Sequence, residues 1–282
     1  FTATYSMSSP ADDAIDGSSI PINISSFTDA TGNAGTTITA TTDGSAVTYD
    51  NTLPTLGTVT ISSNNTYGHL AAETDLVSLT IVSSENINTP TVSMLGSTAD
   101  VTVTQGATTS NWTAAKTVTG GHSDGTAAFN IQFTDLAGNS GAAVTSLTGG
   151  DDPVTVDKTD PTITTASIAS NNGSGDELAV PGNIITLTIV SNEDIVEPTV
   201  TIATQTAAVA IGANAQNWTA TYTMTENESN GTIPFSIAFL DSAGNNGITQ
   251  TALANDADGN NVNYDKSQPV LSNVTLTTDN AF

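Results

Sequence analysis

The sequence predicts an all-β fold made of repeated two-sheet Greek-key sandwiches, and three observations predict it. Ser and Thr together make up 80 of the 282 residues, and β-branched residues favour strands. Gly, Asn and Asp, which favour turns, fill most of the sequence between the Val and Ile positions. The third observation is an internal repeat of about 107 residues, which holds six or seven short strand patterns.

The repeat is marked most clearly by a motif, Phe-x-Asp-x-x-Gly-Asn-x-Gly, that occurs three times. The interval between its copies is constant, since 135−29 and 241−135 both equal 106. Asn-Trp-Thr-Ala also recurs, from Asn111 and from Asn217, and Phe1-Thr-Ala-Thr-Tyr5 reads as an earlier copy of it. The copies of the longer motif lie at 27–35, 133–141 and 239–247.

Three related segments mark the boundaries between repeats: 49–54, 156–161 and 264–269. They predict the C-terminal half of a repeat at 1–55, complete repeats at 56–162 and 163–270, and the start of a further repeat at 271–282. We expect the sandwiches to be arranged end to end, because the linkers are too short for free rotation. A half sandwich cannot bury its own apolar face, so we interpret the chain as a segment of a longer repetitive protein.

Within a repeat, apolar and polar residues alternate with period two, as in a strand with one buried face. Val77, Leu79 and Ile81 show this alternation clearly. The first copy keeps the pattern only if one extra residue lies at Ser25-Ser26, which predicts a β-bulge.

Two tryptophans, Trp112 and Trp218, lie in predicted strands. We expect them to be core aromatics, with a sugar-stacking platform as the alternative interpretation.

The boundary and loop motifs resemble those of a known family. The motifs are Asp-Lys-Thr-Asp-Pro-Thr from Asp157, Ser-Asn-Asn from Ser63 and from Ser170, Ser-Asn-Glu193, and Asp-Leu-Ala-Gly-Asn-Ser-Gly from Asp135. They resemble the bacterial immunoglobulin-like (Big-type) tandem repeats of large prokaryotic surface proteins, such as adhesin stalks, surface filaments and S-layer proteins. The resemblance implies immunoglobulin-like (Ig-like) sandwiches and an extracellular, cell-surface location. It implies no ligand.

Charge and composition exclude several function classes. The chain has 3 basic and 28 acidic residues and a formal charge of −25, so it cannot cluster the Lys and Arg that nucleic acid or anionic lipid needs. No apolar run approaches 18 residues, which excludes a spanning helix. The chain has no Cys, so it forms neither disulfides nor thiolate metal sites. The acidity predicts affinity for cations.

Acidic segments from three parts of each repeat are expected to meet at a junction. In an Ig-like sandwich the chain enters at one end, and the loops after the second and sixth strands return to that end. Calcium takes six to eight oxygen ligands, and crowded carboxylates repel one another without a cation. The sequence therefore predicts Ca²⁺ at each junction. The predicted ligands are Asp50, Glu85, Asp135 and Asn139 at the first junction, Asp157, Asp160, Glu193, Asp194, Asp241 and Asn245 at the second, and Asp265 one repeat later.

The alternative interpretation is that these Asp and Asn residues cap turns. A hairpin at Thr42-Asp43-Gly44 would send Asp50 to the wrong end of the repeat. The segment Asp256-Ala-Asp258-Gly259-Asn260 resembles half of a calcium loop, but it has no equal in the other repeats and we interpret it as a turn.

The sequence favours a non-catalytic structural and interaction protein. Phosphate-binding and nucleophile-elbow motifs are missing from it, and its paired carboxylates lie in predicted turns. We expect neighbouring repeats of the same chain as partners, and identical chains in a filament or lattice are a further option. The competing interpretation is a glycan-binding accessory module of a secreted protein.

Overall fold

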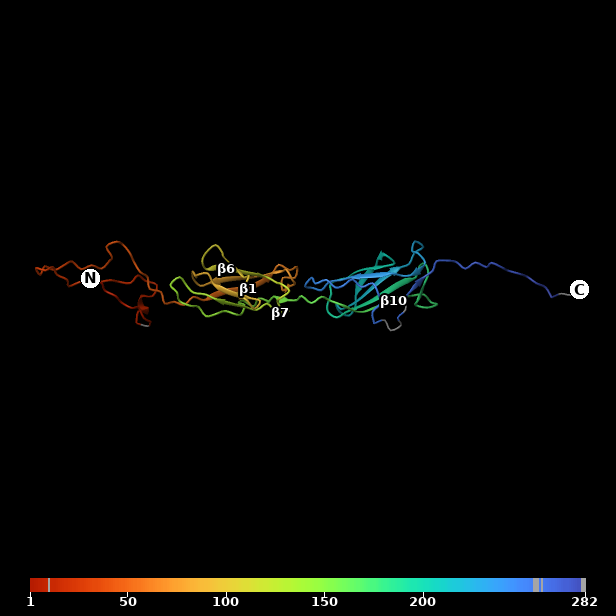
Figure 1. The fold of residues 1–282 in the computed structure, drawn as a ribbon, viewed down its shortest axis with the longest axis horizontal. Coiled ribbons are helices and arrows are strands. Elements are labelled where there is room, and N and C mark those ends of the chain that lie inside the picture. Colours follow the sequence, from red (N-terminus) through yellow and green to blue (C-terminus); the bar gives the residue numbers. More distant parts are fainter. Residues whose placement is uncertain (10, 256–258, 260, 280–282) are drawn as a thin grey trace. The chain divides into compact units, whose positions relative to one another are not determined.

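The computed structural model describes residues 1–9, 11–255, 259 and 261–279 (Figure 1). These residues form strands and loops, with one short 3₁₀ helix at Asp13–Ile15. The chain divides into two compact units, one of Phe1–Asn64 with Glu73–Val156 and the other of Asn65–Ala72 with Asp157–Phe282. Among the described residues, no helix is long and apolar enough to cross a membrane.

The first complete repeat contains a four-stranded antiparallel sheet in the order β1-β3-β6-β5. A second pair, β4 with β8, lies in the facing layer, and β7 pairs with β9. The strands of this repeat are β1 Leu56–Ser63, β2 Leu70–Ala71, β3 Leu76–Ser83, β4 Thr91–Met94, β5 Thr102–Gln105, β6 Asn111–Thr117, β7 Gly125–Thr126, β8 Phe129–Gln132 and β9 Thr155–Val156.

The second complete repeat has the same order in its larger sheet, β10-β12-β16-β15, faced by β14-β13-β18. Its small third sheet has the order β11-β19-β17. The strands are β10 Ile163–Ser170, β11 Leu178–Ala179, β12 Ile184–Ser191, β13 Thr199–Ile202, β14 Gln205–Thr206, β15 Ala208–Ile211, β16 Asn217–Thr223, β17 Gly231–Thr232, β18 Phe235–Ala238 and β19 Asn263–Tyr264.

This strand order defines the fold class. In an Ig-like sandwich the first, second, fifth and fourth strands form one sheet, and the third and sixth strands lie in the other. Leaving aside the two-residue strands, β1, β3, β4, β5, β6 and β8 match that arrangement in chain order, and the second repeat matches it too. The chain is therefore all-β and contains tandem Ig-like sandwiches, as predicted.

The predicted alternation places the core between the two sheets of each repeat. Val77, Leu79 and Ile81 are fully buried, and each sandwich gains a buried Trp from β6 or β16. The indole N–H of Trp112 donates to the Thr109 carbonyl at 2.9 Å. Both tryptophans are at most 7% exposed, so they are core aromatics and not exposed platforms.

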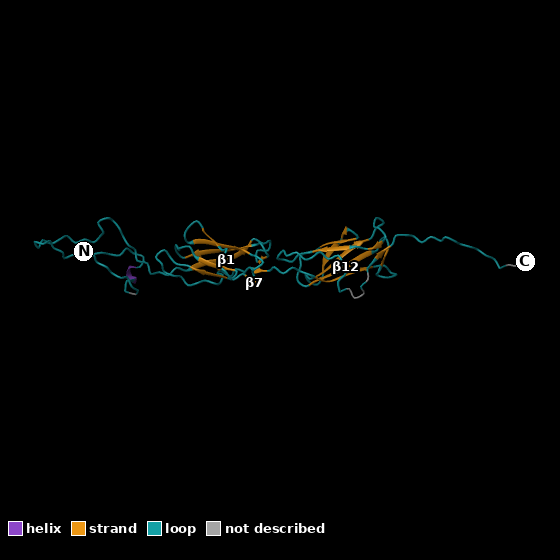
Figure 2. Ribbon diagram, in the orientation of Figure 1, coloured by secondary structure: helices purple, strands orange, loops and turns teal. Residues whose placement is uncertain are grey.

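The described part of residues 1–55, which leaves out residue 10, contains isolated β-bridges and no extended strand, and Figure 2 shows it as loop apart from the short helix. The predicted extra residue is confirmed, since the bridges at Ile24 and Thr28 are four residues apart where the later copies have three. Ser26 takes up the extra residue with a left-handed φ of 60°. Several apolar side chains here are exposed, and Val47 is 66% exposed.

Candidate metal centre

The Asp-x-x-Gly-Asn motif forms the same compact loop in each complete repeat. The backbone N–H groups of Gly138 and Asn139 donate to Asp135 Oδ1 at 2.7 and 2.8 Å, and Asn139 Nδ2 donates to Oδ2 at 2.7 Å. Gly138 has a φ of 104°, which only glycine adopts without strain. The Asp241 loop repeats these three hydrogen bonds at 2.7, 2.9 and 2.8 Å.

The asparagine of each loop also holds the linker before the sandwich. Asn139 Nδ2 donates to the carbonyl oxygen of Asp50 at 3.1 Å, and Asn245 Nδ2 donates to that of Asp157 at 3.0 Å. Each amide thus connects the loop carboxylate to the backbone of the linker. The linker carboxylate is positioned as a result.

The third carboxylate follows β3 in the first complete repeat and β12 in the second. At the end of β3, Ser83 Oγ donates to the Glu85 carbonyl oxygen, and in the second repeat Ser191 Oγ donates to that of Glu193 at 2.5 Å. Ser84 N donates to the Thr55 carbonyl at 2.8 Å, which fastens this loop to the linker. These contacts set the start of the loop that carries the glutamate.

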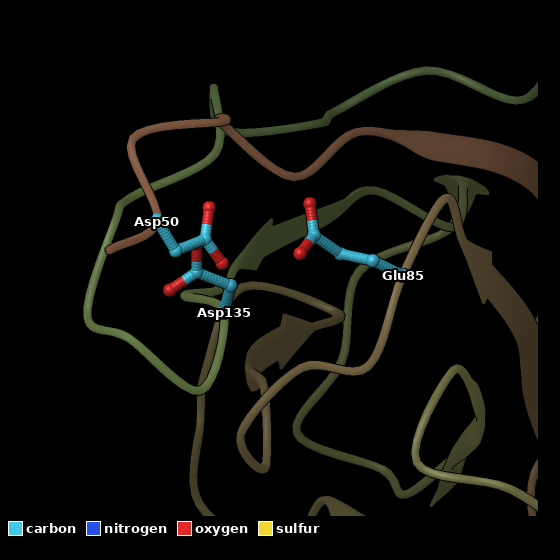
Figure 3. Close-up of side chains that lie close together, drawn as sticks. All are labelled: Asp50, Glu85 and Asp135. Carbon is cyan, nitrogen blue, oxygen red and sulfur yellow. The ribbon is translucent and has the colours of Figure 1, made fainter. Parts of the chain in front are cut away.

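The three segments bring three carboxylates together in each repeat. One oxygen each from Asp50, Glu85 and Asp135 lie within 4.8 Å of one another, and Figure 3 shows the Glu85 carboxylate pointing toward the other two. The same holds for the oxygens of the second group, which comprises Asp157, Glu193 and Asp241. In both groups the linker aspartate and the glutamate are partly exposed and the loop aspartate is buried.

The electrostatics of the first group favour a cation. Burial raises the pKa of Glu85, and the negative charges of Asp50, Asp135 and Asp16 raise it further. Burial also opposes ionisation of Asp135, but hydrogen bonds from Asn139 and Gly138 outweigh it and lower the pKa of that carboxyl. Two like charges 4.8 Å apart repel by about 0.9 kcal/mol even in bulk water. A bound cation would remove this repulsion.

The separation of the carboxylate oxygens is compatible with one shared divalent cation such as calcium. Calcium–oxygen distances of 2.3–2.6 Å place two ligands on opposite sides of the ion about 4.6–5.2 Å apart. One such ion could therefore be shared by carboxylate oxygens that lie within 4.8 Å of one another. Three carboxylates supply three to six oxygens, and carbonyls or water can complete the set.

Several predicted ligands lie elsewhere. Asp160 and Asp194 are exposed and lie outside the three-carboxylate groups. Asn139 and Asn245 hold the groups together through their Nδ2 atoms. Asp265 Oδ1 accepts from Asn230 Nδ2 at 2.9 Å and Ser267 N at 2.8 Å. Residues 256–258 and 260, proposed as a turn, lie outside the described residues.

The last glycine of the motif has a role that the sequence reading missed. A Cβ on Gly141 would lie 2.2 Å from Phe133 Cε2 and 2.7 Å from the Pro54 carbonyl oxygen. Only a residue without a side chain lets the ring and the linker approach the loop so closely. The spacing of eight residues between Phe133 and Gly141 does not by itself reveal this contact.

The linker is also held on its other side. The backbone N–H of Asn51 donates to Asp16 Oδ1 at 2.6 Å, and Thr52 Oγ1 donates to Asp16 Oδ2 at 2.8 Å. Asn230 plays the same part in the second repeat, where its Oδ1 accepts from Lys266 N at 3.1 Å and its Nδ2 donates to Ser267 Oγ at 2.7 Å. Asp16 and Asn230 each directly precede a glycine, at the same position of their repeats. The residue at this position therefore binds the linker that follows its repeat.

These features define a class of protein, Ig-like sandwich repeats with acidic groups at the linkers. No protein-family model matches the sequence, and no curated protein matches it. Similar solved structures include "Crystal Structure of Rst D1-D2" at 10% identity and a TM-score of 0.32, which covers 72% of this chain and 98% of that chain. The "D00-D0 domain of Intimin" is 13% identical, with a TM-score of 0.29 and coverage of 68% and 98%. "Marsupial T cell receptor" is 13% identical, with a TM-score of 0.27 and coverage of 75% and 65%.

Proposed function

We propose that this chain is a non-catalytic, extracellular structural segment of a long repetitive prokaryotic surface protein, stiffened by calcium at the linkers between repeats. An adhesin stalk, a surface filament and an S-layer protein all fit this description. The observation that carries the proposal is the recurrence of one three-carboxylate group at the same place in two successive repeats.

The composition of each group explains why calcium would act on the linker. One carboxylate comes from the linker, while the other two come from loops of the following sandwich. An ion bound to all three joins the linker to the sandwich. Calcium that binds only the folded state adds RT ln(1 + [L]/Kd), about 2.7 kcal/mol at a hundredfold excess over Kd.

The alternative is a glycan-binding accessory module of a secreted protein. The exposed Thr residues of the strands favour it, but the two tryptophans are buried and cannot stack on a sugar. A glycan array with the full chain separates the two functions. Specific binding would favour the accessory module, and a spacer would bind no glycan.

Calorimetric titration of the full chain with Ca²⁺ tests the main proposal. We expect two ions per chain, one for each three-carboxylate group, and small-angle scattering that changes when EDTA removes them. The variant Asp157→Ala should lose one ion, while Asp160→Ala, three positions further along the linker and outside the group, is the matched control and should keep both. Absence of binding heat, or identical scattering and melting with and without EDTA, would overturn the proposal.

A further inference from the structure

One inward-facing position differs in chemistry between the two complete repeats. In β6 it is Lys116, which is 4% exposed. Its Nζ donates to the carbonyl oxygens of Met94 at 3.1 Å and Ser97 at 3.4 Å. These two carbonyls belong to the tight turn that follows β4. The first repeat therefore supplies its own ammonium group to the turn.

The second repeat has the same turn, but no lysine among its described residues lines the pocket at that turn. Ile202 pairs with Gln205, as Met94 pairs with Ser97 in the first repeat. Ala203 and Thr204 have φ values of 53° and 66°, so the turn is left-handed here too. Thr204 is β-branched, and such residues rarely adopt this conformation. The second repeat therefore keeps the left-handed turn although its sequence does not favour that conformation.

A pocket of about 280 Å³ lies beside this turn. It is bounded by Ala203, Thr204 and Gln205 on one side and by the loop from Asn227 to Pro234 on the other. Tyr222, which replaces the lysine, turns to Glu228 and donates from its hydroxyl to Oε1 at 2.6 Å.

Glu228 gives this pocket a buried negative charge. The residue is 9% exposed and lines the pocket. Its Oε2 accepts from Thr225 N at 2.7 Å and Thr225 Oγ1 at 2.9 Å, whereas Oε1 accepts from Tyr222 alone among the described contacts and can take one more donor. The neighbouring Lys266 donates to the Glu226 carbonyl at 2.8 Å.

The first repeat carries a different pair of residues at these two positions. His122 occupies the place of Glu228, and its Nδ1 accepts from Thr119 N at 2.9 Å as Glu228 accepts from Thr225 N. The first complete repeat therefore has lysine and histidine at these two positions, and the second has tyrosine and glutamate. The second repeat has the counter-charge for an ammonium group and a pocket at its turn, but its lysine, Lys266, donates to the Glu226 carbonyl and does not line the pocket.

We propose that the pocket of the second repeat binds a primary ammonium group, of the kind carried by a small alkylamine or a lysine side chain. Glu228 Oε1 supplies the counter-charge, and Gln205 and the turn carbonyls supply neutral acceptors. Lys116 is the built-in counterpart in the first repeat. The chain's charge of −25 raises the local concentration of cationic ligands around the pocket.

Amide NMR of the full chain, titrated with n-butylammonium in about 0.15 M NaCl, tests the proposal. We expect saturable shifts at 203–205 and 227–232, and none at the corresponding first-repeat turn, 95–97. Tetramethylammonium, which has no N–H donor, and n-butanol, which has no charge, are the matched controls. Saturable shifts with both controls equal to those with n-butylammonium, or no saturable shift at all, would overturn the proposal.

Two variants sharpen the test. Glu228→Gln keeps an acceptor for Thr225 and removes the charge, so binding should weaken by about tenfold or more. Tyr222→Lys should place the chain's own ammonium in the pocket and abolish binding while the fold is retained. Unchanged affinity in both variants would contradict the proposal.

A blocked lysine, N-acetyl-lysine methylamide, distinguishes the source of the ammonium group. Binding of both ligands supports a lysine side chain, and binding of n-butylammonium alone supports a small free amine. Binding of neither overturns the proposal.

Discussion

Residues 1–55 and the matching part of the second complete repeat carry the same motifs but differ in what they bury. Phe27 is 43% exposed where Phe239 is 7% exposed, and Val47 is 66% exposed where Val262 is fully buried. The acidic loop is nevertheless formed in both places, since Asn33 Nδ2 donates to Asp29 Oδ2 at 2.8 Å. The loop is therefore encoded locally, and the burial of apolar side chains depends on the facing sheet.

The largest expected effect comes from supplying that sheet. Fusing residues 163–217 ahead of Phe1 would add copies of β10 to β15, which cover the equivalent face in the second repeat. We expect Phe27 and Val47 to become buried, each contributing about 1.5–3 kcal/mol. The backbone N–H groups of Ile24 and Ile38 donate to each other's carbonyl oxygens at 2.8 and 2.9 Å. Protection of these two amides from hydrogen exchange measures the gain in stability. A fusion with Leu187→Asp in the added segment is the control and should give no protection.

A pair of phenylalanine variants measures the same difference within the natural chain. Phe133 is 5% exposed, so Phe133→Ala should leave a cavity and lower the free energy of unfolding of the first complete repeat by about 3–5 kcal/mol. Phe27→Ala, at a ring that is 43% exposed, should cost less than about 1 kcal/mol. Denaturant unfolding followed by Trp112 fluorescence compares the two. Equal costs would mean that residues 1–55 have a core of their own.

Calcium binding should also separate the two regions. Asp135→Ala removes a buried member of a three-carboxylate group, and we expect it to lose one ion and the accompanying stabilisation, about 2.7 kcal/mol at a hundredfold excess over Kd. Asp29→Ala changes the equivalent loop of residues 1–55, which contributes no described carboxylate group, and should leave the stoichiometry unchanged. Calorimetry of both variants checks this. Loss of an ion in Asp29→Ala would show that the loop binds calcium alone.

Glycine variants test the close approach of loop, ring and linker. In Gly141→Ala the new Cβ would meet both the Phe133 ring and the Pro54 carbonyl, and we expect a cost of about 1–3 kcal/mol. In Gly35→Ala it would meet only Phe27, an exposed ring that can turn away, so the cost should be smaller. Thermal unfolding of the two variants gives the comparison. A Gly35→Ala cost as large as that of Gly141→Ala would contradict it.

The smallest expected effect is the pH dependence of the first carboxylate group in EDTA. The pKa of Glu85 is raised in the folded state, so its ionised form lowers stability above that pKa, and the penalty disappears as the pH falls through it. The pKa of Asp135 is lowered, so its contribution is present above about 3.8 and is lost as the pH falls further.

Glu85→Gln should therefore raise the free energy of unfolding at pH 7 in EDTA, by about 0.2–1 kcal/mol for a partly exposed group, and the gain should vanish in acid. In saturating Ca²⁺ the same variant should be the less stable one. Denaturant unfolding at pH 4 to 8 measures both, and a gain that persists in acid would assign the effect to packing.

The sequence was informative where chemistry repeats at a fixed interval. Strand alternation predicted the core, and the recurrence of Asp135 as Asp241 predicted that this loop would meet the linker. The sequence could not show that Glu193 and not its neighbour Asp194 joins the group. Loop residues do not alternate regularly between inward and outward positions as strand residues do. The sequence also missed Asp16, Gly141 and the exchange of Lys116 for Tyr222, since each depends on contacts between segments distant in sequence.

The amide of Asn139 joins the Asp135 carboxylate to the carbonyl of Asp50 in the preceding linker. Any tension along the chain enters the sandwich through this linker, so Asn139 and Pro54 are among the first contacts to experience it. A pull that moves Asp50 displaces one member of the carboxylate group and strains the hydrogen bond that positions the second. Mechanical load and the cation proposed above would therefore act on the same few atoms, and each would change the response to the other.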